Sequence, residues 1–274
     1  MTDMQRHIIQ NLIPVKEAAG VLGKDIETLR SYEWSGPEEK YVWEWLKRSI
    51  LVRQFEALET IIFLAENNRG PFGVTMLRPA YEEYLWAKYL EKHETFARKI
   101  SLLLLRREID DTVDAQNVYL GAKTMQHLGF TQKRIKQMQA SFRPGSTELR
   151  EIGRALKWRN EQPPGAAALA RETGDEREYN FIYHATSRYV HFSTHELCRR
   201  VWGQKGKVKI GSDQFSGYWT DFALYWAFRI FIYTCREFVD IWPGEDDSSL
   251  EALLPSIEKL SPVPIITSSE LESW

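Results

Sequence analysis

The sequence predicts an all-α protein, a single-domain bundle of about six to eight helices with no significant sheet. Apolar residues recur every three to four positions over long segments, which is the spacing of one face of an α-helix. The 274 residues are 43% hydrophobic and 13% aromatic, enough to fill a helical core. Eleven prolines and 16 glycines are few for an all-β protein, which needs many turns.

Two long helical segments are expected first. Apolar residues at helical spacing mark 3–30, where Pro14 leaves open whether one helix or two form. The next segment begins near Pro37, because proline followed by acidic residues is typical of a helix N-terminus. It runs to about residue 65, where asparagines and a glycine are typical of a helix end.

Four helices are expected in the middle of the chain. In 73–92, Pro79 requires either a kink or a helix that begins at the proline. A long helix covers about 94–120, and two shorter helices cover 131–142 and 147–158. Short loops between long helices favour antiparallel packing of neighbours.

The last third of the chain contains two core helices. A loop rich in Pro and Gly is expected over 159–174, followed by one continuous helix over 175–202. A Gly- and Lys-rich connection, 203–217, leads to a last core helix at 218–242. A strand would lie only near 207–210, and one isolated strand does not make a sheet.

The chain is expected to divide into a helical domain and a tail. The helical domain covers 1–244 and ends at a Pro-Gly pair. The C-terminal tail, 245–274, is expected to be partly disordered because it is rich in Ser, Pro and acidic residues. Its leucines near 250–254 could form one short docking helix.

Charge and cysteine content exclude several classes of protein. Thirty-six Lys and Arg face 38 Asp and Glu, which gives no global argument for nucleic-acid binding and excludes a polybasic membrane binder. Cys198 and Cys235 are too few for a disulfide framework. The apolar segment 222–235 is shorter than the roughly 20 residues of a membrane span, and it carries Arg229. We expect a soluble, cytoplasmic protein with no membrane partner.

The sequence lacks the common catalytic motifs. The string at 203–207 has neither the spacing nor the hydroxyl of a phosphate-binding P-loop. The dinucleotide-binding, serine-hydrolase and zinc-protease motifs are also absent. We therefore expect no cofactor, and whether the chain is an enzyme stays open.

Polar side chains form a stripe on the helix expected at 175–202. At about 100° per residue, the stripe contains Asn180, His184, Arg188, His191 and His195, with Ser187 on its flank. The opposite side contains Ile182, Ala185, Tyr189, Phe192 and Leu197. Three interpretations stay open: a solvated or structurally hydrogen-bonded face, a proton-transfer or nuclease site, and a metal pair at His191 and His195.

A second polar cluster centres on Arg78 and Glu82, four residues apart in segment 73–92. An exposed pair in this order contributes only about a few tenths of a kcal/mol. If the pair were buried it would need further partners, and breaking it would cost about 3–5 kcal/mol. Both the exposed pair and the buried functional pair stay open.

A basic stretch without acidic residues follows the stripe. It contains Arg199, Arg200, Lys205, Lys207 and Lys209, with Trp202 among them. Basic side chains beside a stacking aromatic suit a phosphate backbone, so RNA is one candidate partner. A solvated lysine-rich loop is the alternative.

Two motifs resemble those of a known family. They are Arg78-x-x-x-Glu82, which follows a short polar turn within the helix pair 55–90, and Tyr183-x-x-x-Ser187-x-x-x-His191. Over about 40–240 the chain resembles the bacterial proteins of domain-of-unknown-function family 5677. This resemblance implies an all-helical fold and no established activity. We then expect the two motifs to meet as an inter-helix polar site, shielded from water, that binds a ligand or a partner.

A remoter resemblance is to the HEPN helical ribonucleases, whose motif is an arginine and a later histidine with four to six residues between them. Arg188 and His195 fit this spacing, and so do Arg177 and His184. The resemblance implies a metal-independent endoribonuclease of phage defence or of a toxin–antitoxin system. Arg188 would then hold the phosphate and His195 would act as acid or base on the ribose hydroxyl, with His191 as a further catalytic candidate, in a cleft built by a homodimer.

Overall fold

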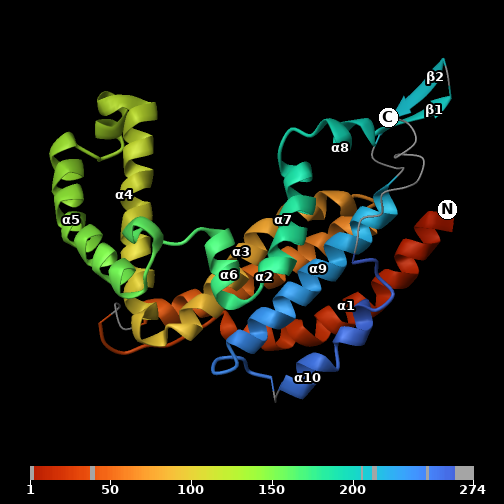
Figure 1. The fold of residues 1–274 in the computed structure, drawn as a ribbon, viewed down its shortest axis with the longest axis horizontal. Helices are drawn as coiled ribbons and strands as arrows, with labels where there is room; N and C mark the ends of the chain where they lie inside the picture. Colours follow the sequence, from red (N-terminus) through yellow and green to blue (C-terminus); the bar gives the residue numbers. More distant parts are fainter. Residues whose placement is uncertain (1–2, 38–40, 205, 212–214, 245–246, 263–274) are drawn as a thin grey trace. The chain divides into compact units, whose positions relative to one another are not determined.

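The protein is predominantly helical, as the sequence predicts (Figure 1). The computed structural model describes residues 3–37, 41–204, 206–211, 215–244 and 247–262. Within these ranges the chain forms ten α-helices, more than expected, and one two-stranded sheet. Two compact units result, the first from residues 1–33, 47–89 and 169–274 and the second from residues 34–46 and 90–168. The expected division into 1–244 and 245–274 stays a prediction.

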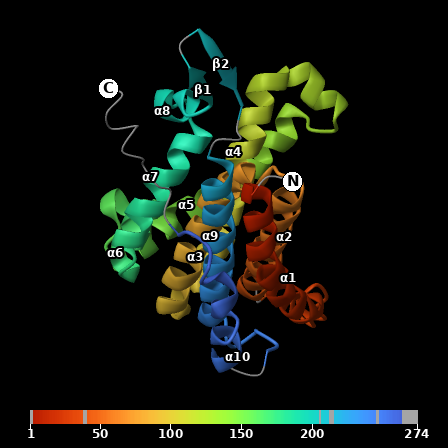
Figure 2. The ribbon, with the colours of Figure 1, turned by 90° about the vertical axis from the view of Figure 1, so that its right-hand side faces the viewer.

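Most helices belong to the first unit. They are α1 (Asp3–Leu29), α2 (Val42–Glu66), α3 (Val74–Lys92), α6 (Ala166–Thr173), α7 (Glu176–Val190), α8 (Thr194–Cys198), α9 (Ser216–Glu237) and α10 (Asp247–Glu251). Three of them, α2, α3 and α6, extend a few residues beyond this unit. Figures 1 and 2 show α9 lying alongside α1, α2 and α3, so α9 is the central helix of the unit.

Helix α9 is apolar on nearly all sides, which is typical of a helix buried in a core. Phe222, Phe228 and Phe231 are fully buried, and the ring of Phe231 lies 5.6 Å from that of Phe55 on α2. The segment 222–235 is therefore a core helix. Within the described part of the chain, no helix has both the length and the apolarity that crossing a bilayer requires.

A close approach joins α9 to the 3-10 helix η2 (Gly70–Gly73), which precedes α3. A Cβ atom at Gly70 would lie 2.2 Å from Oγ1 of Thr220 on α9. Only glycine fits at this distance, so Gly70 allows the start of α3 to pack directly on the core helix.

The second unit is built on a helical hairpin of α4 (Glu94–His127) and α5 (Gln132–Ala155), followed by the 3-10 helix η3 (Arg159–Glu161). Its buried apolar residues include Ile100, Leu103, Leu149 and Ile152. A smaller buried cluster near the turn contains Val113, Met125 and Ile135. Helix α4 extends beyond the expected end at residue 120, although Gly121 interrupts it with φ 75° and ψ 158°.

Three prolines lie inside helices. For two of them the sequence left alternatives open, and for the third the predicted helix boundary is wrong. Pro14 lies inside the single helix α1, and Pro79 lies inside α3, which begins before it at Val74. Instead of separate helices at 131–142 and 147–158, one helix, α5, runs through Pro144. Apolar residues along α5 pack against α4, and their burial outweighs the roughly 3 kcal/mol cost of an internal proline.

The expectation of one helix over 175–202 is also wrong. Helix α7 ends just before His191, whose backbone is extended at φ −110° and ψ 167°. Ser193 begins the new helix α8, because its hydroxyl accepts a hydrogen bond from the backbone N–H of Glu196 at 3.4 Å. Phe192, expected on the apolar face, is 85% exposed. The polar stripe is therefore not continuous. Asn180, His184 and Arg188 lie on α7, His195 lies on α8, and His191 lies at the corner between these two helices.

A β-hairpin follows this corner. Strand β1 (Val201–Gln204) pairs with β2 (Lys207–Ile210) in antiparallel register, so the segment expected to be at most an isolated strand has a partner. A Cβ atom at Gly203 would lie 2.3 Å from the carbonyl oxygen of Lys207, and Gly203 has φ 141°. Glycine is needed there for the strands to approach.

Part of the expected tail packs onto the first unit. It contains α10 and the 3-10 helix η4 (Leu254–Ile257), and both Leu250 and Ile257 are buried. The rest of the tail, residues 263–274, lies outside the described residues.

Candidate functional site

Arg78 is the centre of a polar cluster that joins α3 to α7. Its Nε atom lies 3.1 Å from Oε1 of Glu82, and its guanidinium carbon lies 4.4 Å from the ring centroid of Tyr183. Its Nη1 atom lies 3.2 Å from Nε2 of His191. We call Arg78, Glu82, Tyr183 and His191 the Arg78 cluster. These four belong to the five residues expected to form the inter-helix site.

The fifth residue, Ser187, is not part of the Arg78 cluster. Its hydroxyl oxygen is buried and makes no hydrogen bond among the described residues. It lies one turn from both Tyr183 and His191 on the chain, but the end of α7 turns the backbone away before His191. The expected Tyr-x-x-x-Ser-x-x-x-His row is therefore not a row of contacting side chains.

The Arg78 cluster lies at the surface, contrary to the expected shielding from water. The side chains of Arg78 and Glu82 are 28% and 40% exposed, and His191 is exposed. The hydrogen bond to Glu82 raises the pKa of Arg78 above its ordinary value. Because solvent screens an exposed ion pair, the Arg78–Glu82 pair contributes little to stability. The same exposure leaves the Arg78 cluster accessible to a ligand.

Arg188 forms a second cluster with two histidines. Its Nη2 atom lies 2.7 Å from Nε2 of His184, and its Nη1 atom lies 3.4 Å from Nδ1 of His195. A guanidinium only donates hydrogen bonds, so a ring nitrogen that bonds to Arg188 does so as the acceptor. We call these three residues the Arg188 cluster. The break after α7 allows His195 to turn back toward Arg188.

A pocket of about 160 Å³ lies between the end of α7 and α8. It is lined by Arg188, Tyr189, His191, Phe192, Ser193, Glu196, Leu197 and Arg200. Glu196 is buried, and its Oε1 atom lies 3.6 Å from Nη1 of Arg199 and 3.9 Å from Nδ1 of His195. Burial raises the pKa of Tyr189 to about 12. His191 both lines this pocket and contacts Arg78, so it links the two clusters.

The expected basic stretch separates into two parts. Arg199 lies 4.5 Å from the ring of Phe215, and Arg200 lies 6.0 Å from the ring of Tyr189, so both fold back onto the protein. Lys207 and Lys209 are exposed on β2. Lys205 lies outside the described residues. Trp202 pairs with Lys209 across the hairpin, which puts the indole and the lysines on one face.

The metal interpretation loses its geometric basis. His191 and His195 have helical metal-ligand spacing in the sequence, but the helix ends between them. In the part of the chain that the structure describes, no three His, Cys, Asp or Glu side chains converge to hold a metal ion.

An internal charged contact of the first unit was not expected from the sequence. Nε of Arg229 on α9 lies 3.4 Å from Oε1 of Glu178 on α7. The guanidinium also lies 4.8 Å from the ring of Tyr233. Burial raises the pKa of Glu178 above its ordinary value, and Arg229 opposes that rise. The single arginine in the apolar run 222–235 was a usable signal, since a charge in a core requires a partner.

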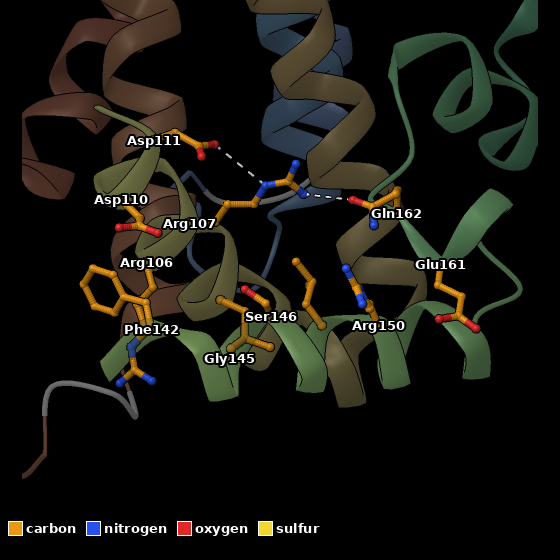
Figure 3. Close-up of a pocket in the computed structure, with 12 residues that line it drawn as sticks. Arg106, Arg107, Asp110, Asp111, Phe142, Gly145, Ser146, Arg150, Glu161 and Gln162 are labelled. Carbon is orange, nitrogen blue, oxygen red and sulfur yellow. Dashed lines mark hydrogen bonds and ion pairs between the residues drawn. The ribbon is translucent and has the colours of Figure 1, made fainter. Parts of the chain in front are cut away.

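The second unit contains another pocket, of about 220 Å³, between α4, α5 and η3 (Figure 3). Arg107 spans its mouth, with Nε 3.8 Å from Oδ2 of Asp111 and Nη1 3.3 Å from Oε1 of Gln162. Burial, Asp114 and Asp111 raise the pKa of Asp110. Three arginines and three carboxylates line this pocket, so its lining favours neither sign of ligand.

The fold and the two surface clusters define a class: a mostly α-helical protein with an arginine–histidine surface site and a small β-hairpin. The model of a family of unknown function (DUF5677) matches residues 44–208, more than half of the chain, and the protein belongs to this family. The matched segment includes both clusters. No curated protein and no solved structure matches the chain, so neither comparison shows a likeness to HEPN ribonucleases.

Proposed function

We propose that the pocket between α7 and α8, together with the adjoining Arg78 cluster, binds an anionic group such as a phosphate. One observation carries this proposal: the guanidinium of Arg188 lies against the imidazoles of His184 and His195 and contacts no carboxylate among the described residues. By contrast, Glu82 accompanies Arg78 and Glu196 accompanies Arg199. An oriented arginine without a carboxylate partner is suited to bidentate recognition of a phosphate or a carboxylate.

The hairpin supports a ligand that extends beyond a single phosphate. Lys207, Lys209 and Trp202 share one face of the hairpin, and the hairpin follows α8 directly. Lysines beside an aromatic ring suit a phosphodiester backbone with exposed bases. This arrangement favours RNA over a free anion as the ligand.

Ribonuclease activity is the second candidate, favoured by the contact between Arg188 and His195. One imidazole would remove the proton from the ribose 2′-hydroxyl, whose oxygen attacks phosphorus, while another would protonate the departing 5′-oxygen. Arg188 would stabilise the negative charge of the pentacoordinate phosphorus. A 2′,3′-cyclic phosphate and a 5′-hydroxyl would result, without a metal.

Calorimetric titration with inorganic phosphate and with a nucleoside monophosphate tests the binding proposal. Arg188→Gln should weaken binding by about tenfold or more, because it removes a charged donor from the pocket. The matched control is Arg177→Gln, an exposed arginine on the same helix that does not line the pocket. Equal binding by both variants would contradict the proposal.

A further inference from the structure

The turn of the second unit's helical hairpin carries a concentrated positive charge. Residues 115–147, here called the basic hairpin tip, contain no Asp or Glu. At the chain's average of 38 acidic residues in 274, a stretch of this length would carry about five. The cationic residues of the tip are Lys123, Lys133, Arg134, Lys136 and Arg143. This local excess is hidden in the chain's net charge of −2.

The structure leaves most of this charge in solvent. Lys123 lies near the end of α4, and Lys133, Arg134 and Lys136 lie in the first turns of α5; all four are exposed. Ile135, between the cations of α5, is buried. The apolar face of α5 therefore packs inward, and its cationic side chains face water.

The cations of α5 lie where the helix itself disfavours them. The N-terminus of a helix carries a partial positive charge, and acidic residues are the favourable ones there. The first turn of α5 has no acidic residue and contains Lys133 and Arg134. An external anion bound here would relieve the repulsion between these cations and the positive N-terminus of α5.

The carboxylates nearest in sequence bond to groups other than the cations of the tip. On one side, Oδ1 of Asp114 accepts a hydrogen bond from Gln139 at 2.6 Å. On the other side, Glu148 forms an ion pair with Lys99. Neither contact involves a lysine of the tip.

The other exposed side chains indicate the class of anion. Tyr119 is 88% exposed on α4, two residues after Asn117, whose amide oxygen accepts a hydrogen bond from Gln132 at the start of α5. Lysines, amides and an exposed aromatic ring suit a phosphate backbone with stacked bases. The apolar face of α5, which a membrane surface would require, is buried against α4; the tip exposes the aliphatic side chains of Val118 and Leu128, so anionic vesicles are the competing ligand that the test must exclude.

We propose that the basic hairpin tip binds single-stranded nucleic acid, with Lys133 and Lys136 contacting phosphates and Tyr119 stacking on a base. This surface belongs to the second unit and is independent of the function proposed for the pocket between α7 and α8.

Fluorescence anisotropy with the full chain and a labelled single strand of about 20 nucleotides tests the proposal. Lys133→Glu/Lys136→Glu should weaken binding by about tenfold or more and flatten its dependence on salt. Lys24→Glu/Lys259→Glu makes the same charge change at exposed lysines of the first unit and should bind close to wild type. Equal losses in both double variants would overturn the proposal, as would no oligonucleotide binding by wild type.

Three further arms sharpen the result. Tyr119→Ala should weaken binding of the single strand more than binding of a duplex, because stacking requires an unpaired base. Anionic vesicles and poly-glutamate should compete poorly; preferential binding of either would overturn the assignment to nucleic acid. In an Arg188→Gln background, Lys133→Glu/Lys136→Glu should still weaken the remaining binding by about tenfold, which separates the tip from the pocket. Circular dichroism confirms that each variant remains helical.

Discussion

Nη1 of Arg78 lies 3.2 Å from Nε2 of His191, although 113 residues separate them in the sequence. Because a guanidinium only donates hydrogen bonds, Nε2 of His191 is the acceptor in this contact. Arg78 thereby positions an exposed imidazole at the edge of the pocket between α7 and α8. The two residues act as a unit, and variants of either should affect ligand binding more than stability.

Arg78→Lys tests whether the shape of the guanidinium matters. Arginine uses Nε for Glu82, Nη1 for His191 and its plane for Tyr183, and a lysine ammonium reproduces at most one of these contacts. We expect phosphate binding to weaken by about tenfold in calorimetry, with an unfolding free energy within about 1 kcal/mol of wild type. Undiminished binding by Arg78→Lys would show that charge alone suffices.

His191→Ala tests whether this histidine supports the fold. An exposed side chain with one exposed hydrogen bond contributes little, so the free energy of unfolding should change by no more than about 0.5 kcal/mol. Phosphate affinity should fall nevertheless. A loss of several degrees in the thermal midpoint, relative to His127→Ala as an exposed control, would instead indicate a structural role.

The raised pKa of Glu178 should make the free energy of unfolding depend on pH. Its pKa is raised by burial above the ordinary 4.5, so the folded state holds its proton at pH values where the unfolded state has lost it. Stability from this group is present below the unfolded pKa and is lost as pH rises through the folded pKa. In urea unfolding between about pH 4 and 7, Glu178→Gln should therefore show a less negative slope than wild type.

Glu161 is the control of opposite sign for this experiment. Arg154 lowers the pKa of Glu161, so any stability from this pair is present above the unfolded pKa and is lost as pH falls. In the Glu161→Gln variant, the free energy of unfolding should still fall as pH rises, as it does in wild type. If Glu178→Gln and wild type have the same slope, the burial assigned to Glu178 is wrong.

Gly70→Ala tests the packing of η2 on α9. The new methyl would meet Oγ1 of Thr220 at 2.2 Å, and the resulting displacement should cost about 1–3 kcal/mol in chemical denaturation. Gly165→Ala is the matched control, since no atom lies within 4 Å of its Cβ position. Equal stabilities of the two variants would contradict the close approach.

Cleavage of RNA tests the second candidate function. Wild type should leave 2′,3′-cyclic phosphate ends in the presence of a chelator, and His195→Ala should abolish this product. Intact RNA and equal growth of strains expressing wild type and His195→Ala would leave a binding site without chemistry. His184→Ala, which removes the other imidazole on Arg188, should reduce the rate less.

Helix content was predictable because it depends on local periodicity. The apolar run of α9 and the segments of α2 and α3 were recognisable, since an α-helix repeats every 3.6 residues whatever it packs against. The Arg78–Glu82 pair followed from the same spacing. Confirmed membership of the family of unknown function also rests on the sequence alone. The acid-free run 115–147 was readable too, although a global charge count conceals it.

The break after α7 was not predictable from periodicity. No Pro or Gly marks it, and Ser193 can occupy a helix interior as well as a cap. The continuity of α5 through Pro144 was also misjudged, because burial against α4 outweighs a local cost.

The sequence by itself therefore determined the helical class, the buried character of α9, and which residues share a turn of one helix. Only the tertiary structure decided that His195 returns to Arg188 in a part-buried contact and that His191 reaches Arg78 in an exposed one. The physical reason is range: helical spacing follows from adjacent backbone hydrogen bonds, whereas contacts across 113 residues depend on how whole helices pack.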